Sequence, residues 1–281
     1  MNQRLAITII QTNLYWEDKR ANLQMLEHKI SSIKEKTEMV VLPEMFSTGF
    51  SMKPETLAET MEGETVLWMK RIAAEQKIIL TGSVIIADTG EVGAVRPLYY
   101  NRIIWMLPNG QFGIYDKRHL FAFAGEAEHF AAGTKRLIAS VKGWKINLQV
   151  CYDLRFPVWA RQAPSQPPHK GEEKAPEYDV LIYVANWPER RSTAWKILLQ
   201  ARAIENQCYV VGVNRVGKDG NDINYSGDSM IIDPLGEILF NKKDDEDIFT
   251  ITLDKDHLQT VRKKFPFWKD GDGFQITTTP L

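Results

Sequence analysis

Strand-like and helix-like patterns alternate over the first 86 residues, and this order limits the fold more than any other feature of the chain. Residues 5–10 form a mostly apolar strand, apolar side chains at helical spacing follow it, and residues 39–42 form a second, short strand. The same order returns in a helix over 66–76 and a strand over 78–86. Two successive β-α-β units predict an α/β fold.

Two turn motifs indicate that the sheets are mixed rather than purely parallel. Residues 108–110 (Pro-Asn-Gly) separate strand patterns over 99–107 and 111–115, and residues 233–236 (Asp-Pro-Leu-Gly) separate two more. These residue types favour the tight turns of β-hairpins, whose strands are antiparallel. We therefore expect sheets that combine parallel and antiparallel pairing. The length of 281 residues fits one large domain or two small ones.

The charge balance excludes several classes of partner. The chain has 35 basic and 36 acidic residues and a net charge of −1, so it offers no basic surface for nucleic acid or an anionic membrane. No apolar run reaches the roughly 18 residues of a membrane span, and the N-terminus has no signal-peptide pattern. We therefore expect a cytoplasmic protein that acts on a small molecule. Its two cysteines, Cys151 and Cys208, are too few for a disulfide framework.

Cys151 is the strongest candidate for a catalytic residue. It follows an alternating strand over 144–150 and opens a turn, which places its sulfur at the mouth of a sheet. Glu44 and Lys117 also follow strand patterns, and strand ends in an α/β sheet share an edge. A carboxylate can take the thiol proton and an ammonium can stabilise an oxyanion, so the three residues form a complete set for acyl transfer.

Other chemistries fit the sequence less well. His119 or His129 could pair with Cys151 as in papain, but glutamate and lysine already supply the base and the cation. Glu128 beside His129 lacks the spaced histidine and cysteine partners of a zinc site, and neither a Walker loop nor G-x-G-x-x-G occurs. We therefore expect no metal and no cofactor. Cys208 is expected in the core.

Three motifs resemble those of a known superfamily. Residues 42–46 (LPEMF), 115–121 (YDKRHLF) and 151–157 (CYDLRFP), in this order and separation, are similar to the catalytic motifs of the nitrilase superfamily of carbon–nitrogen hydrolases. The likeness covers nearly the whole chain, so we expect a single domain over residues 1–281. Further segments resemble the bacterial ω-amidase branch of that superfamily, and they lie at residues 125–130, 183–188, 201–207 and 264–268.

The resemblance implies a role for each motif residue. Glu44 would be the general base, Lys117 the cation that stabilises the oxyanion, and Cys151 the nucleophile. Glu126 resembles a second glutamate that the family keeps beside the lysine, with Glu128 as a rival for that role. The backbone N–H of Tyr152 would complete the oxyanion hole.

For an ω-amidase the resemblance implies substrates such as 2-oxoglutaramate and 2-oxosuccinamate. Such a molecule has a carboxylate far from its amide, and Arg155, Arg190 and Arg191 are candidate partners for it. Phe46 and Trp187 could wall a narrow pocket or belong to ordinary packing. Amides of other small acids, N-carbamoyl compounds and deaminated glutathione remain alternative substrates, a nitrile fits less well, and a non-catalytic binding relative is a distinct alternative.

The resemblance also implies the architecture. It is a four-layer α-β-β-α sandwich, in which two mixed sheets pack face to face with helices outside. Family members pair through helices near the active site, so we expect a homodimer or a multiple of it. Residues 163–176, rich in proline and charge, depart from the branch pattern and predict a solvated loop, either at the rim of the site or as a surface insertion.

Overall fold

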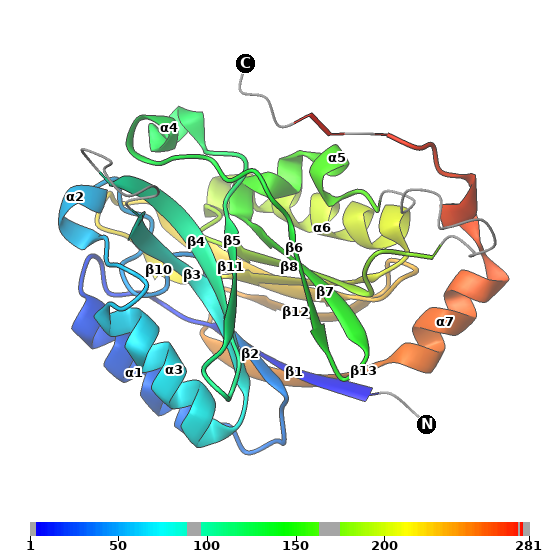
Figure 1. Ribbon diagram of the computed structural model, residues 1–281, viewed down its shortest axis with the longest axis horizontal. Coiled ribbons are helices and arrows are strands. Elements are labelled where there is room, and N and C mark those ends of the chain that lie inside the picture. Colours follow the sequence, from blue (N-terminus) through cyan, green and yellow to red (C-terminus); the bar gives the residue numbers. More distant parts are fainter. Residues whose placement is uncertain (1–3, 89–96, 163–174, 275, 278–281) are drawn as a thin grey trace.

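The computed structural model describes residues 4–88, 97–162, 175–274 and 276–277. Two mixed sheets pack against each other and helices cover their outer faces, as Figure 1 shows with α1 and α3 outside one sheet and α6 outside the other. The expected four-layer sandwich is confirmed. Most of the loop expected at 163–176 lies outside the described residues.

The first sheet has the strand order β13-β1-β2-β3-β4-β5. Pairing is parallel from β1 to β2 to β3 and antiparallel elsewhere, so the predicted β-α-β units and the first hairpin are both present. Its strands are β1 (Arg4–Gln11), β2 (Met39–Val41), β3 (Ile79–Asp88), β4 (Leu98–Met106), β5 (Phe112–Asp116) and β13 (Asp247–Asp254). Its helices are α1 (Lys19–Ser31), α2 (Pro54–Leu57) and α3 (Glu64–Gln76).

The second sheet has the order β10-β11-β9-β8-β7-β6, and β12 also pairs with β11. Pairing is parallel from β7 to β8 to β9. Its strands are β6 (Leu137–Val141), β7 (Trp144–Val150), β8 (Val180–Ala185), β9 (Tyr209–Asn214), β10 (Val216–Lys218), β11 (Asn224–Ile232) and β12 (Ile238–Lys243). The remaining helices are α4 (Glu126–His129), α5 (Pro157–Ala160), α6 (Ser192–Asn206) and α7 (Lys255–Lys264). None of the described helices is long and apolar enough to cross a bilayer.

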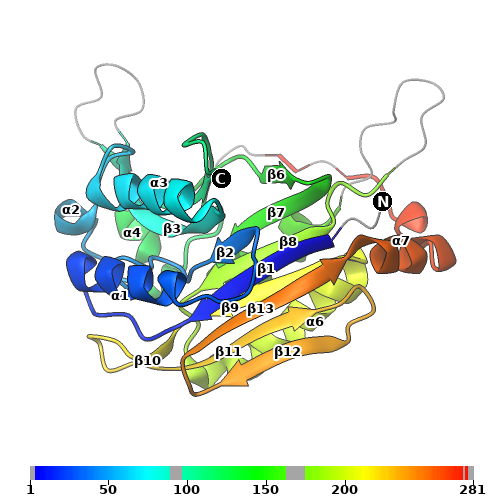
Figure 2. The ribbon, with the colours of Figure 1, turned by 90° about the horizontal axis from the view of Figure 1, so that it is seen from below.

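Strands near the centre of the first sheet are apolar on both faces because both faces are covered. Ile7 and Val41 face the second sheet, whereas Ile10, Val40 and Leu80 pack in the cluster beneath α1 and α3. All five are at most 1% exposed, and burying each such side chain contributes about 1.5 to 3 kcal/mol. Figure 2 shows the layers from a second direction.

A glycine lets α6 approach the second sheet closely. A Cβ atom added at Gly212 in β9 would lie 2.5 Å from Leu199 Cδ1 and 2.9 Å from Trp195 Cζ2 of α6. Any larger residue would force the helix away from the strand. The helix is thus held in a fixed position over the strands whose ends carry the site described next.

Candidate active site

Cys151 lies at a sharp turn directly after β7. Its φ angle of 43° is in the left-handed region, which costs a residue other than glycine about 1 to 2 kcal/mol. The turn opens the 3-10 helix η2 (Cys151–Arg155). Asp153 stabilises it by accepting hydrogen bonds from the Val150 N–H (3.0 Å) and the Tyr115 hydroxyl (2.7 Å). The surrounding structure therefore maintains the strained conformation that presents the thiol.

Glu44, Lys117 and Glu126 form one buried cluster. Lys117 Nζ lies 2.9 Å from Glu44 Oε1, and it lies 3.0 and 2.9 Å from the two carboxylate oxygens of Glu126. All three side chains are 0% exposed. Glu44 comes shortly after β2, Lys117 directly after β5, and Glu126 is the first residue of α4. The fold thus brings together three residues that the sequence analysis selected separately.

The structure places Glu126, and not its rival, beside the lysine. Glu126 is fully buried, whereas Glu128 is exposed on the same one-turn helix. The backbone N–H of Phe121 donates to Glu126 Oε2 at 2.6 Å. This bond fixes the carboxylate that receives Lys117.

Two asparagines that the sequence analysis gave no role hold the carboxylates in place. Asn101 Nδ2 donates to Glu44 Oε1 at 2.8 Å and to Glu126 Oε1 at 3.2 Å. The backbone N–H of Asn186 donates to Glu44 Oε2 at 2.7 Å, and the Asn186 main-chain oxygen lies 4.0 Å from Cys151 Sγ. The only sequence signal for Asn101 was its own polar side chain within the mostly apolar pattern of β4.

Burial and neighbouring charges determine the protonation of the cluster. Burial raises the pKa of the Cys151 thiol well above its usual value, the charge of Glu44 raises it further, and Lys117 opposes the rise. Burial alone would lower the pKa of Lys117, but Glu126 and Glu44 raise it overall. Burial also raises the pKa of Glu126, against the opposing charge of Lys117. At neutral pH the thiol is therefore protonated and the lysine is charged.

The backbone N–H of Tyr152 is available for a ligand. Tyr152 is the second residue of η2, and the first N–H groups of a helix have no partner within the helix. Its side chain is half-buried and lines the same cavity as Cys151. An oxygen bound between this N–H and Lys117 would receive two donors.

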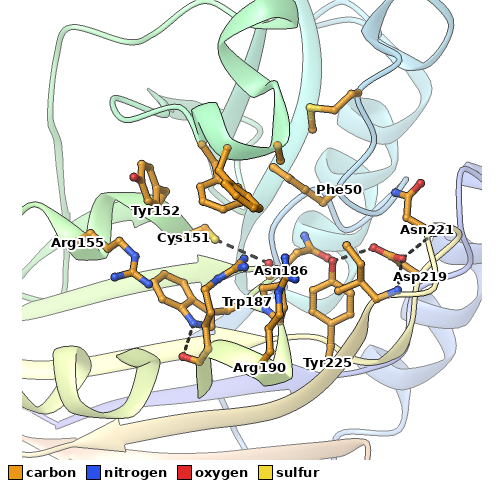
Figure 3. Close-up of a pocket in the computed structure, with 17 residues that line it drawn as sticks. Phe50, Cys151, Tyr152, Arg155, Asn186, Trp187, Arg190, Asp219, Asn221 and Tyr225 are labelled. Carbon is orange, nitrogen blue, oxygen red and sulfur yellow. Dashed lines mark hydrogen bonds between the residues drawn. The ribbon is translucent and has the colours of Figure 1, made fainter. Parts of the chain in front are cut away.

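Cys151 borders a cavity of about 250 Å³, drawn in Figure 3. The volume is below the roughly 300 to 1,000 Å³ of pockets for drug-sized ligands, so the cavity suits a small substrate. Trp187 lines it, which agrees with the first of its two candidate roles, pocket wall or ordinary packing. Aromatic side chains form much of its wall, namely Phe50, Phe121, Phe123, Tyr152, Trp187 and Tyr225.

Phe46 is not among the residues that line this cavity, so of its two candidate roles, pocket wall or ordinary packing, the structure agrees with packing. It is fully buried in the core beneath α3, with its ring centre 6.0 Å from that of Trp68. Its ring lies so close to Gly82 that a Cβ atom there would be 2.7 Å from Phe46 Cδ1. The positive φ of Met45, 43°, turns the chain just before Phe46. Phe50 lines the cavity instead.

All three arginines that the sequence analysis considered line the cavity. The guanidinium of Arg155 lies 5.1 Å from the ring centre of Trp187, and that of Arg190 lies 6.0 Å from the ring centre of Phe123. Both arginines are exposed, whereas Arg191 is half-buried. The cavity thus combines an apolar wall with cationic side chains.

The two histidines considered as partners of Cys151 make other contacts. His119 Nδ1 lies 2.8 Å from Asp153 Oδ1, and the His119 ring stacks on Phe156 with ring centres 3.8 Å apart. His129 Nδ1 lies 4.0 Å from Glu55. Neither imidazole lines the cavity, so the described residues give no support to a papain-like pair.

Cys208 and Arg202 lie in the supporting structure. Cys208 is fully buried just before β9, as expected for a core residue. Arg202 in α6 pairs with Glu205 at 3.0 Å and donates to the main-chain oxygen of Leu154 at 2.6 Å. Arg202 therefore ties α6 to the turn that carries the thiol.

Comparison with known proteins agrees with this geometry. The family model for carbon-nitrogen hydrolases matches residues 6–263. The omega-amidase YafV of Escherichia coli K12 is 41% identical over 97% of this chain and 98% of its own, and a 2-oxoglutaramate amidase of Bacillus subtilis is 31% identical over 94% and 96%. The crystal structure of XC1258 from Xanthomonas campestris, a CN-hydrolase superfamily protein, superposes with a TM-score of 0.90 at 40% identity over 98% of this chain and 99% of its own. The chain belongs to the carbon-nitrogen hydrolase family, within the nitrilase superfamily.

Proposed function

We propose that the protein is an ω-amidase, which hydrolyses the terminal amide of small keto-acid amides such as 2-oxoglutaramate and 2-oxosuccinamate to ammonia and the dicarboxylate. The observation that carries the proposal is a thiol that borders a small cavity lined by arginines and interacts with the buried cluster of Glu44, Lys117 and Glu126. The names of the two relatives, omega-amidase and 2-oxoglutaramate amidase, support this substrate class.

In the acylation step Glu44 accepts the proton of the Cys151 thiol as the sulfur attacks the amide carbonyl carbon. A resting thiol whose pKa is raised needs such a base at the moment of attack. Lys117 and the Tyr152 N–H stabilise the oxyanion of the tetrahedral intermediate. Glu44 then returns the proton to the nitrogen, the C–N bond breaks, and ammonia leaves a thioester at Cys151.

In the deacylation step Glu44 takes a proton from a water molecule that attacks the thioester. The second tetrahedral intermediate uses the same two donors, the C–S bond breaks, and Glu44 returns the proton to the sulfur. Glu126 acts through Lys117 by holding its ammonium in position. Losing one donor from an oxyanion hole raises a barrier by about 2.7 to 4 kcal/mol, so the position of Lys117 has a large effect on the rate.

We also propose that the protein works as a homodimer in the cytoplasm. Ile197 and Ile204 are 60% and 53% exposed, and they lie two turns apart on the same face of α6, where a second copy could cover them. Both cysteines are free, which suits a reducing compartment. Light scattering that gives twice the 32.2 kDa of one chain would support the dimer, and a monomer would refute it. Cell fractionation tests the location.

Ammonia release from 2-oxoglutaramate tests the proposed activity. It should be compared with release from glutamine, a simple aliphatic amide and an N-carbamoyl amino acid. Release that is much faster from the keto-acid amide than from the other three supports an ω-amidase. If that substrate is inert while another amide is hydrolysed, the substrate class is wrong although the chemistry stands. No release from any of them would favour a non-catalytic binding protein.

A further inference from the structure

The cavity beside Cys151 has an excess of positive charge. Arg155, Arg190 and Arg191 line it, and Asp219 is the one carboxylate among the described lining residues. That carboxylate already accepts hydrogen bonds from the backbone N–H groups of residues 221 and 223, at 2.8 and 3.0 Å, and from the Tyr225 hydroxyl at 2.9 Å. One carboxylate offsets the charge of only one of the three arginines, so the cavity wall keeps a net positive charge that an anionic group on the ligand would balance.

Arg191 differs from the other two arginines in its surroundings. Its side chain is half-buried, and its guanidinium lies 5.0 Å from the ring centre of Phe121. Within the described part of the chain, the guanidinium of Arg191 makes no ion pair or hydrogen bond with an acidic side chain. Burial lowers the pKa of Arg191, and repulsion from Arg190 and Arg155 adds to the effect, whereas negative charge on Cys151 opposes it. A bound anion would relieve this repulsion.

The backbone fixes Arg191 relative to the reacting groups. Its main-chain oxygen accepts a hydrogen bond from Trp187 Nε1 at 2.9 Å, and it ends the short 3-10 segment Glu189–Arg191 that leads into α6. Phe121, whose ring lies under the guanidinium, also donates its N–H to Glu126. One residue therefore contacts both the arginine and the carboxylate that holds Lys117. This contact links Arg191 to the cluster beside the nucleophile.

We propose that Arg191 is the residue that binds the substrate carboxylate distant from the amide, and that it selects ω-amides of short acids over neutral amides. The proposal rests on the ω-amidase function. The buried cluster of Lys117 with two carboxylates has no cation to spare for a second anion. Arg155 and Arg190 are exposed, and water and salt weaken their attraction for an anion. The planar guanidinium of Arg191 matches both oxygens of a carboxylate.

The test compares kcat/KM for ammonia release from 2-oxoglutaramate and from pentanamide, which has no carboxylate. Arg191→Gln should lower the value for 2-oxoglutaramate by about 10-fold to 150-fold, mainly through KM, and leave pentanamide unchanged. Arg191→Lys should restore part of the loss because it keeps the charge but not the fork-shaped geometry. Arg20→Gln, on the exposed surface of α1 and outside the cavity, is the matched control.

A binding measurement separates failure of this proposal from failure of the proposed function. Calorimetric titration of Cys151→Ala protein with glutaramate should show binding that the added Arg191→Gln change weakens by a similar factor. If wild-type protein does not hydrolyse 2-oxoglutaramate but this weakening is seen, the carboxylate site stands and the ω-amidase function fails. If 2-oxoglutaramate is hydrolysed and Arg191→Gln affects both amides equally, or Arg155→Gln or Arg190→Gln produces the selective loss, the assignment to Arg191 is overturned.

Discussion

Replacing Glu126 by glutamine tests whether this buried carboxylate acts by positioning Lys117. The carboxylate of Glu126 receives Lys117 Nζ at 3.0 and 2.9 Å and the Phe121 N–H at 2.6 Å. Glutamine has the same shape, but its NH2 group must face one of these donors. Lys117 then keeps only Glu44 as an anionic partner, at 2.9 Å. The ammonium should lose its fixed position while the fold remains intact.

The expected loss of activity follows from the position of Lys117. If its contribution to the oxyanion hole falls by about 2.7 kcal/mol, kcat falls about 100-fold, since each 1.36 kcal/mol corresponds to a factor of ten. A second effect has the opposite sign. The charge of Glu126 raises the pKa of Cys151, so its removal should lower that pKa. The variant thiol should therefore become more reactive toward a small alkylating agent below its pKa, even as hydrolysis slows.

The two effects are measured separately. Steady-state ammonia release gives kcat, and the rate of alkylation by iodoacetamide against pH follows the thiolate of Cys151. Glu128→Gln is the matched control because Glu128 is exposed on the same helix and does not line the cavity. The reasoning would be refuted if the Glu126→Gln enzyme had an unchanged kcat. It would also be refuted if the alkylation profile of this variant moved to higher pH.

Three further outcomes are expected. Cys151→Ala should abolish ammonia release while the thermal unfolding transition persists; a folded variant that retains turnover would rule out the thiol as nucleophile. In the wild-type protein, alkylation of Cys151 should be slow at pH 7 and still rising at pH 9, because burial and the charge of Glu44 raise the thiol pKa; a plateau by pH 8 would contradict this. Gly212→Ala should destabilise the protein by about 1 to 3 kcal/mol, since its Cβ would lie 2.5 Å from Leu199, and calorimetry should show a lower Tm. A Tm equal to that of wild type would show that α6 moves away without cost.

The sequence predicted the site best where a reactive side chain follows the end of a strand. Apolar strand patterns located Glu44, Lys117 and Cys151 at strand ends, and the structure places all three around one site. The order of strands and helices also predicted the α/β class, whereas the layering depended on resemblance to a family.

Residues whose roles depend on tertiary contacts were harder to predict. Asn101 lies inside β4 and contacts carboxylates from two other segments. Its polar side chain is visible in the strand pattern, but its partners are not. Resemblance favoured Glu126 but left Glu128 as a rival, and burial against Lys117 distinguishes the two. The two roles considered for Phe46 could not be separated from the sequence, because its packing beneath α3 depends on contacts with Trp68 and with Gly82 of β3.

The reacting groups are divided between the two sheets of the sandwich. Glu44 and Lys117 follow β2 and β5 of the first sheet, whereas Cys151 and Asn186 follow β7 and β8 of the second. The hydrogen bond from the Asn186 N–H to Glu44 crosses this boundary at 2.7 Å. Hydrolysis therefore requires that the two sheets have packed against each other. A refolding chain in which each sheet has formed but the interface has not closed would contain every catalytic group and still be inactive, so recovery of activity marks the final step of assembly.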